Sequence, residues 1–380
     1  MALCLSGGGY RATLFHLGAV RRLHEVGLLA RLDAISSVSG GSVFAALLAD
    51  LAIERGWRDG LALDDVEPLA ERVRAVTATD LRTAPFLRHV AWNWLEPRPR
   101  VRELERLLGR HVSGRRIDEL PLRPRFVLCA TDLTHGASWE FARDRVGSYQ
   151  AGYVREATAW PLARAVAASA CFPPVFGPLP IGSAARFRGG RARGKGASMR
   201  VALSDGGVYD NLGFEPVWKS HDCLLVSDGG ATFDFQASSN PVRRLLRYTS
   251  VATNQVRALR YRMLHERFAE GQAQGATWSL RVDVPDGAPG YPAALRERAI
   301  EAIRTDLDRF TAAEQRILEN HGYCVAAARL EAAALNGLAL PPPPPPSPPH
   351  PEWMEPDRAA RALRLSGRRI VPARLLGLMR

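Results

Sequence analysis

The feature that most constrains the fold occurs twice near the start of the chain: a short apolar run ends in glycines and leads into a helical pattern. Residues 2–5 run into three consecutive glycines, and residues 12–26 then carry apolar side chains at helical spacing. Residues 34–38 run into a Ser-Gly-Gly turn, and the strongly apolar residues 43–52 follow. Each unit predicts a strand, a tight turn and a helix.

Three later apolar runs, at residues 125–130, 199–203 and 222–226, are further strand candidates. Strands that are apolar along their whole length and are separated by helices are typical of a parallel sheet covered on both faces. The sequence therefore predicts an α/β protein, a three-layer α/β/α sandwich with a mainly parallel central sheet.

The domain organisation follows from shifts in composition. Residues 1–340 are expected to form one domain, within which the polar, arginine-rich residues 54–120 form a helical cap or insertion over the sheet, either a solvated cover or a lid. A run of prolines makes residues 341–351 an extended linker. The basic tail, residues 352–380, is either a disordered or docked terminus or a segment that lies on an anionic bilayer.

The net charge of +12 raises the question of an anionic partner. Nearly all of the positive charge is arginine, and within the main domain the arginines are scattered rather than gathered into one basic motif. We therefore expect no nucleic-acid partner. An anionic membrane surface and a simple compositional bias both remain open as explanations.

The five cysteines lie far apart, each beside apolar residues, without a Cys-x-x-Cys pair. This pattern predicts buried reduced thiols and no metal site. We also expect no cofactor. The glycine turn begins within the first ten residues, which leaves no space for a secretory signal, and the longest apolar stretch is too short to span a bilayer. We expect a cytoplasmic protein that is either free or peripheral to a membrane.

The two glycine turns together predict a serine hydrolase site. Consecutive glycines after the first strand offer unobstructed N–H groups, which a developing oxyanion requires. Ser39 lies between the second strand and its helix with small residues two positions away on each side, Ser37 and Gly41, as in a nucleophile elbow. The alternative for this turn is a tight glycine bend that only packs the helix against the sheet.

A base must accompany the serine, and the carboxylates are better placed than the histidines, none of which lies in a triad-like motif. Asp205 and Asp228 each follow an apolar strand in a Ser-Asp-Gly-Gly turn. The carboxyl ends of strands are the edge where ligands bind in open α/β sheets. A serine–aspartate dyad, in which the carboxylate takes the hydroxyl proton directly, is therefore the expected chemistry.

With these residues the sequence resembles the patatin-like phospholipases, which share their catalytic core with cytosolic phospholipase A2. The resemblance covers residues 2–335. Five stretches carry it, in chain order: Ser-Gly-Gly-Gly-Tyr-Arg-Ala at 6–12, Ser-Val-Ser-Gly-Gly-Ser at 37–42, Ala-Thr-Asp-Leu-Thr-His-Gly at 130–136, Ala-Ala-Ser-Ala-Cys-Phe-Pro-Pro-Val-Phe at 167–176 and Asp-Gly-Gly-Val-Tyr-Asp-Asn-Leu-Gly at 205–213.

The resemblance implies a role for each of these residues. Ser39 corresponds to the family's nucleophile and Asp205 to the aspartate of its Asp-Gly-Gly motif, which leaves Asp228 as a structural turn residue and the natural rival. The glycine-rich loop implies that the N–H groups of Gly8 and Gly9 form the oxyanion hole, and Gly40, directly after the nucleophile, supplies a further N–H. The sequence departs from the family pattern at Ser6, where plant patatins have aspartate, and at Ser37, which replaces the elbow glycine.

Arg11 matches the arginine of the cytosolic phospholipase branch. It either contacts a substrate phosphate or anchors the glycine loop.

The leading hypothesis is a lipid acyl hydrolase of phospholipase or lysophospholipase type, with lipid or another acyl ester as substrate. An acyltransferase would use the same dyad with an alcohol as acceptor. A non-catalytic module that binds a nucleotide or a membrane is the alternative from a different class. The nucleotide variant lacks both Gly-x-Gly-x-x-Gly spacing and a Gly-Lys-Ser/Thr ending.

Overall fold

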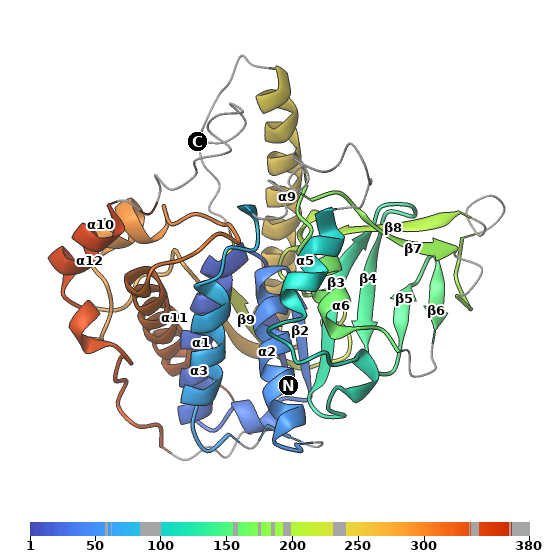
Figure 1. Ribbon diagram of the computed structural model, residues 1–380. Helices are drawn as coiled ribbons and strands as arrows, with labels where there is room; N and C mark the ends of the chain where they lie inside the picture. The colour runs from blue at the N-terminus through green and yellow to red at the C-terminus, as the bar shows by residue number, and fades with distance from the viewer. Residues whose placement is uncertain are drawn as a thin grey trace.

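The computed structural model describes residues 1–57, 60–61, 63–83, 100–154, 159–173, 176–183, 187–192, 199–230, 241–333, 335, 342–364 and 366. Its centre is a sheet of ten strands, with helices on both faces (Figure 1). The strands are β1 (Ala2–Leu5), β2 (Ala34–Val38), β3 (Arg125–Asp132), β4 (Ala137–Ala142), β5 (Val146–Ser148), β6 (Gly152–Val154), β7 (Leu179–Ser183), β8 (Arg200–Asp205), β9 (Cys223–Asp228) and β10 (Gln274–Ser279).

The strands follow the order β10-β9-β1-β2-β3-β4-β5-β6, and β8 pairs with both β3 and β7. From β10 to β3 every pairing is parallel, whereas β4 to β8 pair antiparallel. The predicted three-layer α/β fold is therefore confirmed, with an antiparallel extension on one side that the apolar runs did not reveal. The expected strand at 199–203 is β8, and it runs against its neighbours.

The helices divide between the two faces of the sheet. Leu3, Leu5 and Ile35 point into a large core formed with the helices drawn in front of the sheet in Figure 1, whereas Ala2 and Cys4 point to a smaller cluster beneath α9. The strands are thus buried on both faces, as their unbroken apolar sequences predict. The helices are α1 (Gly9–Glu25), α2 (Gly40–Glu54), α3 (Glu67–Thr77), α5 (Arg100–Leu108), α6 (Leu162–Ser169), α8 (Gly207–Asp210), α9 (Pro241–Ala269), α10 (Ala293–Leu295), α11 (Ala312–Ala332) and α12 (Pro356–Leu363).

The expected cap, residues 54–120, includes α3 and α5. Helix α3 buries Leu69, Val73 and Val76, so it belongs to the same helical layer as α1 and α2. The Trp92-Asn93-Trp94 cluster lies outside the described residues.

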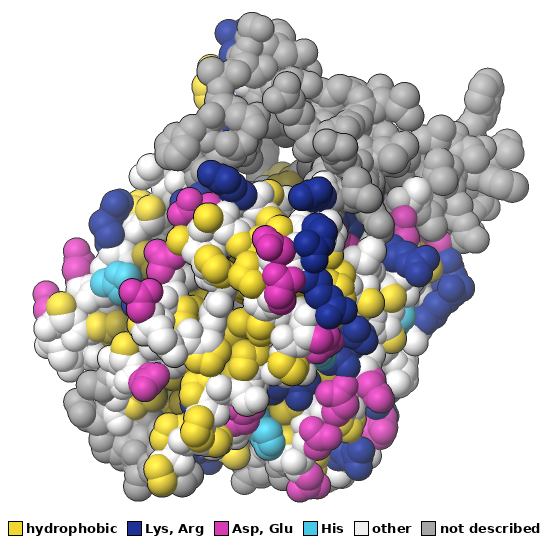
Figure 2. Space-filling view, turned by 90° about the vertical axis from the view of Figure 1, so that its left-hand side faces the viewer, with side chains coloured by type: hydrophobic (Ala, Val, Ile, Leu, Met, Phe, Trp, Pro, Cys, Tyr) yellow, Lys and Arg dark blue, Asp and Glu magenta, His cyan; other side chains and the backbone are white. Residues whose placement is uncertain are grey.

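The described part of the proline segment lies against α1 and α11. Arg22 donates to the carbonyl oxygen of Pro344 (2.9 Å), and the N–H of Ser347 donates to the hydroxyl of Tyr323 (2.9 Å). After it, α12 buries Ala359 and Leu363. Figure 2 shows this side of the molecule, where apolar side chains are surrounded by charges of both signs. The division into domain, linker and tail stays a prediction, and residues 367–380 lie outside the described part.

No described helix is both long and apolar enough to cross a bilayer.

Helices α1 and α11 approach each other through two glycines. A Cβ on Gly18 would overlap the carbonyl oxygen of Glu319, and a Cβ on Gly322 would overlap that of Phe15. Only hydrogen at these positions lets the two backbones come so close.

We therefore expect Gly18→Ala to lower the free energy of unfolding by about 1–3 kcal/mol, the usual effect of overpacking a core. Gly109→Ala is the matched control, because its Cβ would lie 3.4 Å from the nearest neighbour, an ordinary contact. Urea unfolding of both variants measures the difference. Equal stability of the two would show that the helices can separate without loss.

Candidate active site

The sheet register brings Ser39 and Asp205 together. Strand β2 pairs with the first part of β3 up to Val38 opposite Cys129, and β8 pairs with the last part of β3, with Asp205 opposite Ala130. The two strands run in opposite directions along β3, so their carboxyl ends meet. Ser39 follows directly after β2, which places it beside Asp205.

Ser39 occupies a strained backbone position, with φ 50° and ψ −116°, at the N-terminus of α2. Such a conformation is unfavourable for a residue with a Cβ and is characteristic of a nucleophile at a strand-to-helix turn. The residue after Ser39 must be glycine, because a Cβ on Gly40 would overlap the carbonyl oxygen of Gly9. The serine retains 8% of its exposure, so it is reachable but largely enclosed.

Asp205 is buried and has no ion-pair partner among the described residues. Its Oδ1 accepts the N–H of Gly207 (2.7 Å), while Oδ2 has no hydrogen bond of good geometry within the described structure. Burial raises the pKa of Asp205 to about 7, against the smaller lowering effects of the Gly207 N–H and of hydrogen bonding to the Ser39 side chain. A carboxyl with this raised pKa and an acceptor oxygen turned toward a serine has the chemistry to act as a base.

A chain of serine hydroxyls supports the elbow from below. The N–H of Ser39 donates to Ser169 Oγ (2.9 Å), which in turn is hydrogen-bonded to Ser42 Oγ (2.8 Å). Ser42 Oγ is also hydrogen-bonded to Ser37 Oγ (3.0 Å). Ser37, where the family pattern has glycine, therefore belongs to the support of the turn. Ser169 was visible in the sequence only as part of a motif, since nothing local indicates that it reaches residue 39.

The glycine loop presents free N–H groups next to the elbow. Gly8 (φ 145°) and Gly9 (φ 57°) have backbone conformations that favour glycine, and a Cβ on Gly7 would lie 3.1 Å from Ser39 Cβ. The N–H of Gly7 donates to the carbonyl oxygen of Asn211 (3.0 Å), but those of Gly8, Gly9 and Gly40 donate to no group in the described chain. Free N–H groups at helix N-termini suit a negatively charged oxygen.

Arg11 anchors this loop. Its Nη1 donates to the carbonyl oxygens of Ile303 (2.7 Å) and Glu301 (3.0 Å), and its Nε donates to that of Gly229 (3.3 Å). The guanidinium is buried, and burial lowers its pKa to about 10. These contacts suit the anchoring role, whereas Nη2 of Arg11 is buried and has no hydrogen-bond partner in the described structure.

Ser6 and His16 hold the loop from the other side. Ser6 Oγ accepts the N–H of Gly229 (2.9 Å), so this departure from the family pattern ties the loop to the next turn of the sheet edge. His16 Nε2–H donates to the carbonyl oxygen of Ser6 (3.0 Å), and its Nδ1 accepts from Ser227 Oγ (2.7 Å). Burial lowers the pKa of His16 to about 4, so it stays neutral and structural.

Asn211 is a site residue that local sequence reasoning did not single out. Its Oδ1 lies against Gly7 and Gly207, close enough that a Cβ on either glycine would collide with it, and its Nδ2 lies in the same way against Gly230. The amide therefore fills the space between the glycine loop and both Asp-Gly-Gly turns.

Asp228, the rival carboxylate, has a different environment. Its Oδ2 accepts from Arg257 Nε (2.7 Å) and from the Tyr261 hydroxyl (2.9 Å), and its Oδ1 accepts the N–H of Gly230 (3.0 Å). Burial alone would raise the pKa of Asp228, but the Arg257 charge and these hydrogen bonds hold it below its ordinary value. A carboxylate with all its partners in place is a poor proton acceptor.

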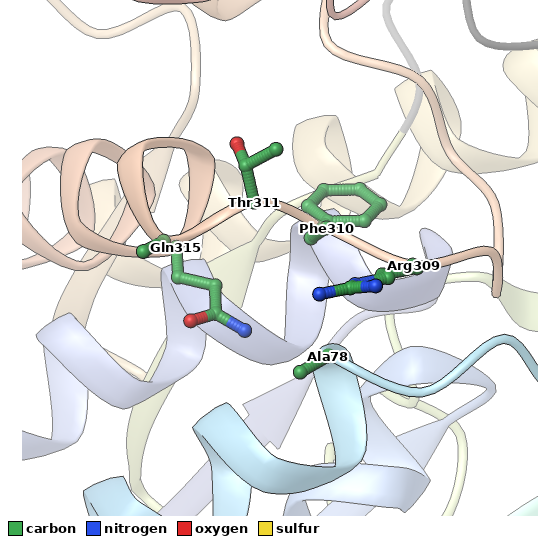
Figure 3. A pocket seen from close by; sticks show the side chains of 6 residues that line it. Ala78, Arg309, Phe310, Thr311 and Gln315 are labelled. Atoms are coloured by element: carbon green, nitrogen blue, oxygen red, sulfur yellow. The ribbon is translucent and has the colours of Figure 1, made fainter.

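A surface cavity of about 470 Å³ lies elsewhere, between the C-terminal end of α3 and the N-terminal end of α11 (Figure 3). Ala78, Phe310 and Gln315 are among its lining residues, and none of the lining residues belongs to the Ser39 site. No cluster of three or more His, Cys, Asp or Glu side chains suited to a metal occurs in the described ranges.

The two aspartates should have opposite effects on stability. Asp205 keeps its proton up to about pH 7 in the folded state, whereas an unfolded aspartate loses it near 3.8, so the wild-type free energy of unfolding falls as the pH rises between these values. Asp205→Asn removes this titration. As the pH rises from 5 to 8, the free energy of unfolding of the variant should therefore increase relative to that of wild type. The measurement is thermal unfolding at both pH values.

Asp228→Asn is the matched control. Its folded pKa is lowered, so the ionised pair with Arg257 stabilises throughout this range, and the variant should be less stable by about 3–5 kcal/mol at both pH values. A difference between Asp205→Asn and wild type that stays constant with pH would contradict the assigned environment of Asp205.

Several solved structures are similar to this chain. Human GIVD cytosolic phospholipase A2 is similar at 13% identity and a TM-score of 0.41, over 60% of this chain and 45% of that chain. Its complex with methyl gamma-linolenyl fluorophosphonate is similar at 16% identity and a TM-score of 0.40, over 67% and 42%. VipD from Legionella pneumophila is similar at 13% identity and a TM-score of 0.39, over 87% and 66%.

The chain thus spans less than two thirds of the length of each of these structures. Among curated proteins, no sequence matches it. The model of the family described as patatin-like phospholipase matches residues 3–218, more than half of the chain. The resemblance in the sequence motifs is therefore confirmed, and the chain belongs to the patatin-like phospholipase family.

Proposed function

We propose that this protein is a lipid acyl hydrolase with a Ser39–Asp205 dyad. The observation that carries the proposal is the buried, unpaired Oδ2 of Asp205 beside the strained Ser39. A carboxyl kept near neutral pKa in an enclosed site is poised to take and return a proton at physiological pH.

In the proposed reaction Ser39 Oγ attacks the ester carbonyl while its proton passes to Asp205 Oδ2. The N–H groups of Gly8, Gly9 and Gly40 hold the oxyanion as it forms, because they have no other partner in the described structure. The alcohol leaves with the proton from Asp205. Water then attacks the acyl-enzyme, Asp205 takes its proton, and the fatty acid is released as Ser39 is restored.

The family and the enclosed site favour an acyl lipid as substrate. Arg11 is engaged with backbone carbonyls, so the proposal assigns it no substrate phosphate. An acyltransferase would share every step up to the acyl-enzyme and replace water with an alcohol. Product analysis in the presence of a lysolipid acceptor separates the two.

We expect a fluorophosphonate probe to label Ser39 and no other serine, because labelling requires an activated hydroxyl next to an oxyanion hole. Ser39→Ala should abolish labelling and reduce hydrolysis of a soluble short-chain ester by several orders of magnitude. Peptide mapping locates the label.

Ser113 provides a matched comparison for this experiment. It also has a positive φ (48°) and its hydroxyl donates to a buried aspartate, Asp50 (3.1 Å), but that carboxylate is paired with Arg72 and Arg115. Labelling of Ser113, or label that persists at Ser37 or Ser42 in Ser39→Ala, would refute the assignment of the nucleophile.

Activity should follow the ionisation of Asp205. Because the carboxylate form is the base and its pKa is raised to about 7, kcat/KM for a soluble ester is expected to rise with pH and to level off above about pH 7. Asp205→Asn should lower kcat by about 10²- to 10⁴-fold. Asp228→Asn should keep most of the activity per folded molecule, and the reverse order would identify Asp228 as the base.

A further inference from the structure

Helix α9 has two halves with different surroundings. Its C-terminal half packs on the sheet, where Leu264 is buried and Tyr261 and Phe268 contact the cluster around Cys4 and Val226. Its N-terminal half has two exposed large apolar side chains: Tyr248 is 66% exposed and Val251 is 40% exposed. Leu259, which is 50% exposed, follows on the same helix in the C-terminal half. In Figure 1 this half rises above the sheet, beyond the other labelled helices.

The exposed apolar side chains share one face of the helix. Positions 248, 251, 252 and 259 follow helical spacing, so Tyr248, Val251, Ala252 and Leu259 form a stripe. Apolar side chains scattered singly on a surface need no explanation, but a stripe on a projecting helix marks an interaction surface.

Two ion pairs fix this stripe relative to the site. Arg257 binds Asp228 at the end of β9, and Arg260 binds Glu215 (2.9 Å), just after the turn that begins at Asp205. Tyr248 precedes Arg257 by nine residues, which is roughly 14 Å along a helix. The projecting half therefore extends past the carboxyl edge of the sheet, the same edge that carries Ser39 and Asp205.

The charge of α9 identifies the partner. Its sequence from 241 to 265 contains six arginines and no acidic residue, and Arg243, Arg244 and Arg247 lie in the first two turns. The positive end of the helix dipole lies there as well. Apolar side chains next to arginines and a helix N-terminus are complementary to a lipid surface with anionic head groups.

We propose that the projecting half of α9 docks on an anionic bilayer and holds the site edge against it. The inference rests on the proposed function and goes beyond it, because it assigns the surface through which a lipid substrate is reached. Tyr248 and Val251 enter the interface, and Arg244 meets the head-group phosphates. The ester is then presented at the edge where Ser39 lies.

The test is vesicle co-sedimentation of the full chain, with phosphatidylcholine vesicles that contain or lack phosphatidylglycerol. We expect binding only with phosphatidylglycerol, weakened by salt. The double variant Tyr248→Ser/Val251→Ser should bind about tenfold more weakly, since two apolar side chains no longer enter the interface. Arg244→Gln should also weaken binding and reduce its dependence on salt.

Leu122→Ser is the matched control, because Leu122 is 65% exposed but precedes β3, at the opposite edge of the sheet. It should bind as wild type does. All these variants should hydrolyse a soluble ester at the wild-type rate, while hydrolysis of vesicle lipid falls in the α9 variants alone.

Equal binding by wild type and the double variant, or binding that ignores phosphatidylglycerol, would overturn the docking proposal and leave the proposed function intact. Binding that depends on α9 without hydrolysis of any ester would support docking and overturn the proposed function. A protein partner in place of a bilayer would be indicated by wild-type protein that fails to bind either vesicle, which also overturns the proposal.

Discussion

The site depends on the pairing of one edge of β3 with two different strands. The first part of β3 pairs with β2 and the last part with β8, and the two run toward each other until their carboxyl ends meet. In a purely parallel sheet the carboxyl ends of neighbouring strands lie side by side and point the same way. Two such ends could not point toward each other as those of β2 and β8 do. Because the ends of β2 and β8 meet, Ser39 and Asp205 are both largely buried. The hydrogen-bonded serine hydroxyls beneath Ser39 stabilise this meeting point.

The two Asp-Gly-Gly turns show how distant residues decide what a local motif does. Both aspartates are buried at the end of a strand, and both accept an N–H from a glycine two residues later. Asp228 is also met by Arg257 and Tyr261 of α9, whereas Asp205 is met by no cation in the described structure. The same tripeptide therefore supports a permanent carboxylate in one turn and a carboxyl of nearly neutral pKa in the other.

Much of this could be predicted from the sequence, because burial on both faces leaves a direct trace in unbroken apolar runs. The strands β1 and β2, their glycine turns and the helices after them were all visible in this way. The direction of β8 was not, since an apolar run reports burial and not orientation. Strand β4 alternates apolar residues with Ser138 and Glu140, and β5 to β7 are short and contain glycine, so none of them forms an unbroken apolar run.

The roles of Ser169, Asn211 and Arg257 were beyond sequence reasoning for another reason. Each acts on a partner that is remote in the chain, and only the folded sheet brings them together. The assignment of Ser39 and Asp205 as catalytic residues rests on geometry and resemblance and stays a prediction.

The position of β1 has a consequence for how the protein folds during synthesis. This first strand lies in the middle of the sheet, between β2 and β9, and Ser6 at its end donates its N–H to Ser227 (3.0 Å). Helix α1 then packs on α11, near the end of the described chain. A nascent chain has therefore made Ser39 and the glycine loop long before Gly229 and Ile303, which hold this loop in place, are available. Such long-range closure slows folding, and it means that the surroundings of Ser39 are completed only after most of the described chain has been made.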